Sequence, residues 1–225
     1  MRLASLLMQR RALLLVALPG WCLLLIAARW LHSGHPAFAF LVWNLILGLV
    51  PLVASWMLVR ADREGASVMA RLFWFMLWLL FLPNAPYIVT DFVHLHPRPP
   101  VAYWYDIALQ YSFAFTGVVV GYASVADVQA LTNRHRGTRT GWVVAILALM
   151  LAGFGIYLGR FVRWNSWDAF VHPHRVLRHV ADGSMDPGDH PRPVGVTLVY
   201  GLGLVMGYVV LRRLVPRSDG RDEEE

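Results

Sequence analysis

The sequence predicts an all-α membrane protein, a bundle in which six helices span the bilayer. Of its 225 residues, 57% are hydrophobic and only 15% are charged, whereas soluble proteins carry roughly 25% charged residues. The hydrophobic residues form uninterrupted runs, and a spanning helix needs about 20 mainly apolar residues. An ordinary soluble domain is therefore excluded, and the high apolar content also excludes a disordered chain.

Cysteine content and charge narrow the class further. Cys22 is the only cysteine, so the chain is not a disulfide scaffold. All 20 basic residues are arginine, and the formal net charge is +6. Because the cytoplasmic loops of membrane proteins collect positive charge, this excess needs no nucleic acid to explain it, and we expect none as a partner. The expected partner is the lipid bilayer.

We expect residues 1–225 to form a single integral membrane domain. Its spans are predicted near residues 12–31, 37–59, 72–92, 105–126, 141–162 and 194–214, and residues 215–225 are an acidic tail without expected structure. The first run follows several arginines, as in a signal peptide, but it is longer than the usual signal core of about 7–15 residues. We therefore interpret it as a span.

The arginines orient these spans. With the N-terminus inside, the inner side holds 13 arginines and the outer side 7. An excess of arginine marks the cytoplasmic side, so both termini are predicted to be cytoplasmic. Five of the seven arginines on the outer side lie within residues 160–192. Because positive charge is disfavoured on that side, we expect this stretch to have a function.

Three spans contain glycines four residues apart, a spacing that lets helix backbones approach closely in lipid. The pairs are Gly117 and Gly121, Gly155 and Gly159, and Gly203 and Gly207. Packing within one bundle is the interpretation that we favour, and oligomerisation through these faces is the alternative.

The third span carries an unusual stretch, residues 82–95, that contains Pro83 and Pro86. Each proline lacks an amide donor and crowds the preceding turn, so the helix is predicted to break there, in the outer half of the bilayer. Irregular backbone at that depth is tolerated only where protein or a water-filled cavity covers it. Asn84 is suited to cap the helix that restarts.

If the restarted segment is an α-helix, four polar side chains share one of its faces, at about 100° per residue. They are Tyr87, Thr90, Asp91 and His94. Ionisable groups at membrane depth are costly and suggest function, so this strip beside a broken helix predicts a site. Each residue alone is also typical of the point where a span leaves the membrane.

The end of the fifth span is basic and aromatic. Arg160 and Arg163 are three residues apart and so are neighbours on a helix, and an arginine fork grips carboxylate or phosphate. The pair predicts an anion clamp, with snorkelling towards lipid phosphates as the alternative. An ion pair between Asp91 and Arg160 would instead tie the third span to the fifth.

The remaining candidate ligand-binding residues flank these stretches. They are Asp106, Asn165, Trp167 and Asp168. Gln110 and Thr116 in the fourth span are expected to form hydrogen bonds between helices, and residues 175–180 a short helix in the membrane interface.

Other chemistry has weaker sequence support. His94, His96, His172 and His174 lack the ligand spacing of a metal site, so we expect neither a metal nor another cofactor. The sequence contains no Walker loop, dinucleotide glycine motif, Gly-x-Ser-x-Gly elbow or His-Glu-x-x-His helix. A catalytic residue is therefore not assigned.

Two of these stretches, residues 82–95 with their Asn-Ala-Pro-Tyr sequence and residues 159–168, together resemble domain-of-unknown-function family 1361. This is a group of bacterial multi-pass membrane proteins. The resemblance extends from about the second span to the sixth. It implies a location in the bacterial inner membrane and implies no activity, so it assigns no role to any residue.

These features favour an outward-facing site that binds or transports a small anionic or lipid-headgroup-like ligand. A structural or assembly subunit of a membrane complex is one alternative. A membrane-embedded enzyme that acts on a lipid-linked substrate, with Asp91 or His94 as general base, is the other. A closed Asp91–Arg160 pair within about 4 Å, with no cavity beside it, would favour the structural role.

Overall fold

The computed structural model describes residues 2–163 and 191–214, and this part of the chain is helical without any strand. Three candidate residues, Asn165, Trp167 and Asp168, lie outside the described residues. So do the expected interfacial helix at 175–180 and the acidic tail at 215–225.

The described helical elements follow one another along the chain. They are α1 (Arg2–Ser33), α2 (Ala39–Arg63), α3 (Val68–Phe81), α4 (Asn84–Tyr87), η1 (Ile88–His94), α5 (Tyr103–Arg136), α6 (Thr138–Tyr157), η2 (Leu158–Val162) and α9 (Pro191–Leu214). Six stretches of the described chain are long and apolar enough to cross a membrane, with α3, α4 and η1 together forming the third and α6 with η2 the fifth. The predicted fold class, an all-α bundle with six spans, is confirmed.

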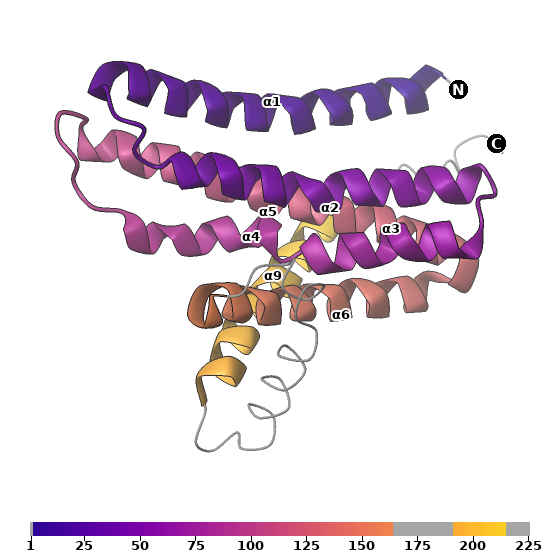
Figure 1. Ribbon diagram of the computed structural model, residues 1–225. Coiled ribbons are helices and arrows are strands. Elements are labelled where there is room, and N and C mark those ends of the chain that lie inside the picture. The colour runs from indigo at the N-terminus through magenta and orange to yellow at the C-terminus, as the bar shows by residue number, and fades with distance from the viewer. Residues whose placement is uncertain (1, 164–190, 215–225) are drawn as a thin grey trace.

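Helix α5 lies at the centre of the bundle. It packs against α1, α2, α4 and α6, whereas α9 packs against α6 and α1 lies along the opposite edge (Figure 1). Within the most apolar part of each span, 61% of α5 is buried but only 17% of α9. The polar groups of α5 are therefore shielded from lipid by its neighbours.

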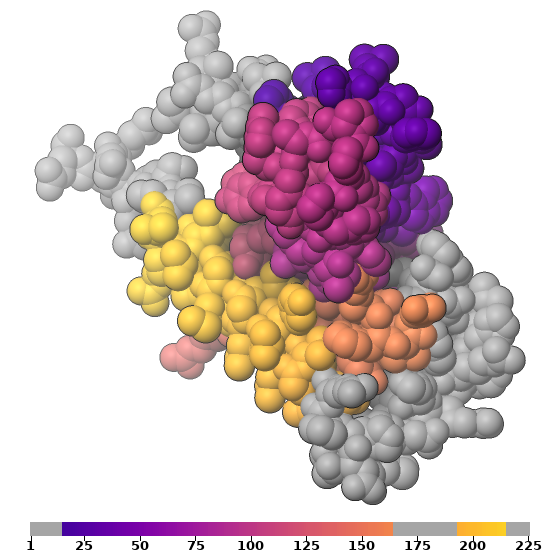
Figure 2. Space-filling view, turned by 90° about the vertical axis from the view of Figure 1, so that its left-hand side faces the viewer, coloured from indigo at the N-terminus to yellow at the C-terminus, as the bar shows by residue number. Residues whose placement is uncertain are grey.

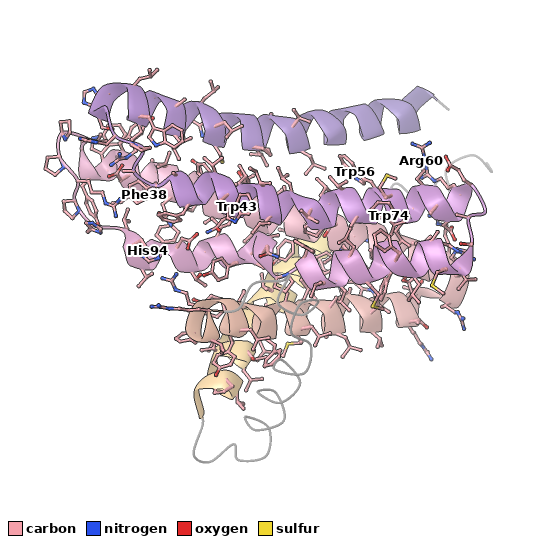
Figure 3. The ribbon with its side chains drawn as sticks, viewed as in Figure 1. Phe38, Trp43, Trp56, Arg60, Trp74 and His94 are labelled. Carbon is pink, nitrogen blue, oxygen red and sulfur yellow. The ribbon has the colours of Figure 1, made fainter. Side chains whose placement is uncertain are left out.

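The bundle has two ends, which we name after a residue at each. The His94 end carries the connections 34–38 and 95–102, and the Arg60 end carries residues 64–67 and Gly137 (Figure 3). Phe38 and His94 lie together at the first end, and Arg60 lies at the other. The candidate polar residues of the third and fifth spans belong to the His94 end.

The third span is broken where the sequence predicts it. Helix α3 ends at Phe81, and the chain passes through Leu82 and Pro83 with right-handed helical dihedral angles (φ −59° and ψ −28° at Pro83). The span therefore continues in the same direction (Figure 1). The predicted cap is wrong, because no side chain caps α4; Asn84 Nδ2 instead donates to the Phe81 carbonyl oxygen at 3.1 Å.

Four glycines from three neighbouring helices surround this break. They are Gly48 in α2, Gly117 and Gly121 in α5, and Gly155 in α6. A Cβ atom on Gly117 would collide with the Ala85 carbonyl oxygen, and one on Gly155 would collide with the Pro83 ring. The irregular backbone is thus covered by protein, as its depth in a bilayer requires.

The paired glycines are used mainly for packing inside the chain. Gly207 lies against the Tyr122 hydroxyl, so it also has a neighbour within the bundle, whereas a Cβ atom on Gly203 would meet nothing within 4 Å. Packing within one bundle is the interpretation that we favoured. Of the six paired glycines, it accounts for Gly117, Gly121 and Gly155 at the break and for Gly207 in α9.

Candidate functional site

The two spans with irregular helix geometry meet at the His94 end. The η1 segment is a 3-10 helix, η2 is a π-helix, and Arg160 of η2 reaches across to η1. Its Nη1 atom lies 3.7 Å from Asp91 Oδ1 and 3.2 Å from His94 Nε2. Short π-helical segments are rare and often occur at functional sites, so this contact defines the candidate site.

Asp91 is held mainly by a residue that the sequence analysis did not identify. Its carboxylate is 2% exposed, and Asn44 Nδ2 in α2 donates to Oδ2 at 2.7 Å. Arg160 lies a full ångström further away, outside hydrogen-bonding distance. The Asp91–Arg160 contact is consequently a loose ion pair beside a tight amide–carboxylate bond. A lone amide in the otherwise apolar second span was the available signal for Asn44.

His94 accepts a hydrogen bond from Arg160. A guanidinium group has donors only, so Nε2 of His94 must be the acceptor, which leaves the ring proton on Nδ1. The imidazole also packs edge-on against Phe40, with 5.4 Å between ring centroids. Arg160 and Phe40 therefore fix the orientation of an exposed imidazole.

Tyr87 and Thr90 do not share this face, which corrects the predicted strip of four residues. A 3-10 helix has three residues per turn, so Thr90 lies above Tyr87 while Asp91 and His94 lie above one another on a different face. Thr90 Oγ1 donates to the Tyr87 carbonyl oxygen at 2.7 Å. The Thr90 hydroxyl therefore donates to the backbone of its own segment and not to Asp91 or His94.

Arg163 does not form a clamp with Arg160. The π-helix has a wider turn than the α-helix assumed for the prediction, so residues three apart no longer lie side by side. Arg163 ends η2 in the left-handed region, with φ 61°, and is exposed, whereas the Arg160 side chain is 19% exposed. Within the described residues, the Nε and Nη2 atoms of Arg160 have no hydrogen-bond acceptor.

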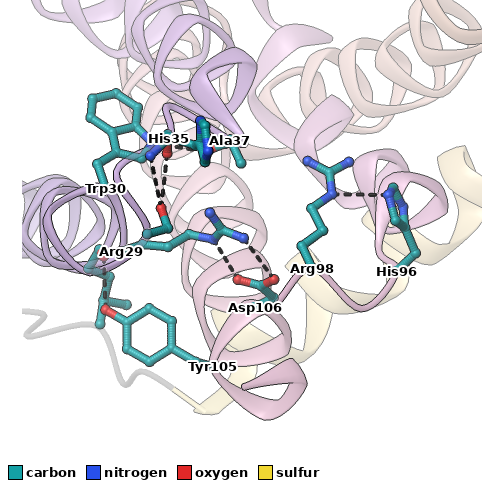
Figure 4. Close-up of polar contacts among 10 residues, drawn as sticks. Arg29, Trp30, His35, Ala37, His96, Arg98, Tyr105 and Asp106 are labelled. Carbon is teal, nitrogen blue, oxygen red and sulfur yellow. Dashed lines mark hydrogen bonds and ion pairs between the residues drawn. The ribbon is translucent and has the colours of Figure 1, made fainter. Parts of the chain in front are cut away.

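Asp106 is separate from this site, because Arg29 of α1 already binds it (Figure 4). The Nε and Nη2 donors of Arg29 lie 2.7 and 3.1 Å from the two carboxylate oxygens, and both side chains are almost fully buried. The Arg29 guanidinium also lies 4.9 Å from the centre of the Phe38 ring, and Arg98 lies 4.4 Å from the same ring. This group joins α1 to α5 and the connections at the His94 end.

The two polar residues expected to link helices have different outcomes. Thr116 Oγ1 lies 3.2 Å from the Cys22 thiol of α1, so this link is present. Gln110 is fully buried, and neither of its side-chain polar atoms has a hydrogen-bond partner within the described residues. The expected interhelical bond of Gln110 is therefore absent there.

Six apolar spans and a polar site at one end of the bundle define a multi-pass membrane protein. Residues 43–206 match the model of the family described as protein of unknown function DUF1361, and the chain belongs to this family. No curated protein and no solved structure shows significant similarity to it. The resemblance to this family that residues 82–95 and 159–168 suggested is thus confirmed.

Proposed function

We propose that the protein binds or transports a small anionic or lipid-headgroup-like ligand at the His94 end, with Arg160 as the residue that receives the anion. The observation that supports this is the incomplete pairing of Arg160. Only its Nη1 atom contacts Asp91 and His94, while Nε and Nη2 have no acceptor within the described residues.

The geometry around Arg160 would allow its guanidinium group to turn from Asp91 towards a bound anion. Asn44 holds the Asp91 carboxylate at 2.7 Å, so Asp91 keeps a partner when Arg160 turns towards a ligand. A carboxylate or phosphate can accept two parallel hydrogen bonds from one edge of a guanidinium group. The Nε–Nη2 edge of Arg160 is available for such a pair, while Nη1 remains with His94.

We also propose that both termini are cytoplasmic in a bacterial inner membrane, so that the site faces outwards. The described arginines are concentrated at the Arg60 end, which has Arg60, Arg63, Arg71, Arg134, Arg136, Arg139, Arg212 and Arg213. The His94 end has Arg29, Arg98, Arg160 and Arg163. Positive charge favours the cytoplasmic side.

The test is thermal unfolding of the purified protein in detergent, with sodium phosphate compared against sodium chloride at equal ionic strength. We expect phosphate to raise the Tm of the natural protein, because a ligand that binds the folded state stabilises it. Arg160→Gln should abolish the phosphate response. Arg60→Gln should keep it, because Arg60 is exposed at the opposite end and pairs with Glu64.

The second candidate is a structural or assembly subunit. The specific observation in its favour is that Asp91 and Arg160 lie within 4 Å, as a helix-tying pair would. In that case phosphate would leave the Tm of the natural protein unchanged, and Arg160→Gln would lower it equally in both salts. This outcome would overturn the anion site.

A further inference from the structure

We infer that the anion received at Arg160 is the phosphate of a membrane lipid, and that the lipid reaches the site sideways from the bilayer. This inference rests on the proposed function, because it specifies the ligand of the same site. Its basis is that apolar side chains at the bundle surface flank Arg160 on both segments that form the site.

The fifth span presents a row of stacked aromatic rings that leads to Arg160. Phe154 and Tyr157 stack with their centroids 6.2 Å apart, and Tyr157 and Phe161 stack at 5.8 Å. Phe161 is 54% exposed and directly follows Arg160 in the chain. A hydrocarbon chain lying along these rings would bury apolar surface beside a headgroup held by the arginine.

The third span also has exposed apolar side chains near the site. Phe92 and Val93, next to His94, are both exposed, Val93 to 68%. Exposed apolar side chains therefore adjoin both members of the His94–Arg160 contact in the chain, Val93 on η1 and Phe161 on η2. Figure 2 looks onto this end, where the magenta residues of the third span and its following connection lie directly above the orange end of the fifth span. An amphiphile uses both kinds of surface, whereas a free phosphate ion uses only the polar one.

The charge at this end complements an anionic lipid. Within the described residues, the buried carboxylates Asp91 and Asp106 are already bound by Asn44 and Arg29, and no carboxylate pairs with Arg98 or Arg163. Since Arg98 and Arg163 have no carboxylate partner among the described residues, they give the described part of this end a positive excess, and basic side chains attract anionic lipids.

The experiment compares three probes by the same thermal unfolding measurement in a neutral detergent. Phosphatidylglycerol carries the acyl chains and a phosphate that gives it a net negative charge, and glycerol 3-phosphate carries an anionic phosphate without chains. Phosphatidylcholine carries the chains and a phosphate whose charge is balanced by its choline group, so it tests whether net negative charge is required. We expect phosphatidylglycerol to stabilise the protein at a concentration at least about tenfold lower than glycerol 3-phosphate, and phosphatidylcholine to have the smallest effect.

Two variants and one matched control locate the effect. Arg160→Gln should abolish the preference for phosphatidylglycerol over phosphatidylcholine. Phe161→Ser should weaken the phosphatidylglycerol response and leave that to glycerol 3-phosphate unchanged. Phe115→Ser is the control, because Phe115 is similarly exposed, at 47%, and stacks on Tyr111 of α5, away from Arg160 in the chain.

The outcomes separate this inference from the proposed function. If glycerol 3-phosphate and phosphatidylglycerol act at the same concentration, the anion site stands and the lipid inference is overturned. If Phe115→Ser weakens the phosphatidylglycerol response as much as Phe161→Ser, the aromatic row is not the docking surface and the inference is also overturned. If neither of the two probes with a net negative charge, phosphatidylglycerol and glycerol 3-phosphate, stabilises the protein, both proposals fail.

Discussion

Two buried carboxylates of this protein have different partners, although both lie near an arginine. Asp106 receives both ends of the Arg29 fork, at 2.7 and 3.1 Å. Asp91 receives the amide of Asn44 at 2.7 Å and has Arg160 at 3.7 Å. The first arginine is fixed in one geometry, whereas the second can leave its carboxylate while that carboxylate keeps the hydrogen bond from Asn44.

Double-mutant cycles should therefore give different coupling energies for the two pairs. Removing one member of a buried pair costs about 3–5 kcal/mol because the other charge stays buried, so Arg29→Gln and Asp106→Asn should each be strongly destabilising and clearly non-additive. The coupling between Arg160→Gln and Asp91→Asn should be non-zero but below about 1 kcal/mol.

Reversible unfolding in mixed detergent would measure both cycles under the same conditions. An Asp91–Arg160 coupling energy equal to that of Arg29 and Asp106 would show that the two arginines are equally fixed. It would support the structural role for Arg160. Strictly additive effects of Arg160→Gln and Asp91→Asn would show that the two residues are not in contact.

At this scale the sequence indicated the site residues better than their partners. Asp91, His94 and Arg160 were identifiable because charged groups stand out in apolar spans. Asn44 is the single amide in α2, and Arg29, near the end of the first span, is one of seven arginines that the sequence assigns to the outer side. Neither residue stood out as a partner for a particular carboxylate. Which of these side chains meet depends on helix rotation and packing, which a single sequence does not specify.

The broken third span shows how backbone and packing combine at the scale of elements. Pro83 and Pro86 set the position of the break because each lacks an amide donor. The tightening of residues 88–94 into a 3-10 helix was not predicted, and the break fits closely among glycines of three other helices. Those contacts join residues far apart in the sequence, so the local pattern gave no indication of them.

Gly117→Ala should destabilise the protein, and Gly203→Ala should not. A Cβ atom on Gly117 would collide with the Ala85 carbonyl oxygen, which belongs to the backbone and cannot turn aside. Overpacking of this kind typically costs about 1–3 kcal/mol. At Gly203 nothing lies within 4 Å, so the higher helix propensity of alanine should make that variant neutral or slightly stabilising.

The Tm values of the two variants, measured in the same detergent, test this packing. Equal Tm values for Gly117→Ala and the natural protein would show that α4 does not pack tightly against α5. The phosphate response is a second readout, since displacement of α4 should also disturb Asp91 and His94 in the η1 segment that follows it.

For the whole molecule, the sequence predicts the number of spans better than their arrangement. Spanning follows from the summed hydrophobicity of each helix, and all six stretches were identifiable on that basis. The central position of α5 had a weaker signal: it is the least apolar of the six spans and contains Asp106, Gln110 and Asp127. Such a span is expected to be shielded from lipid, but its neighbours cannot be derived from its own sequence.

The orientation of the molecule can be tested with single cysteines. Cys22 is fully buried, so the natural protein should give little background with a membrane-impermeant thiol reagent. His96→Cys at the His94 end should react in intact spheroplasts, because this end is proposed to face outwards. Glu64→Cys at the Arg60 end should react only after the membrane is opened, and both native side chains are exposed.

The reverse labelling pattern would place the His94 end in the cytoplasm. The bundle, the Arg160 contacts and the family membership would be unaffected, but the outward-facing site would be wrong. The lipid phosphate reaching Arg160 would then have to come from the inner leaflet. Because the two cysteines lie at opposite ends of the same bundle, one pair of labelling reactions determines both the side of the termini and the leaflet that the site faces.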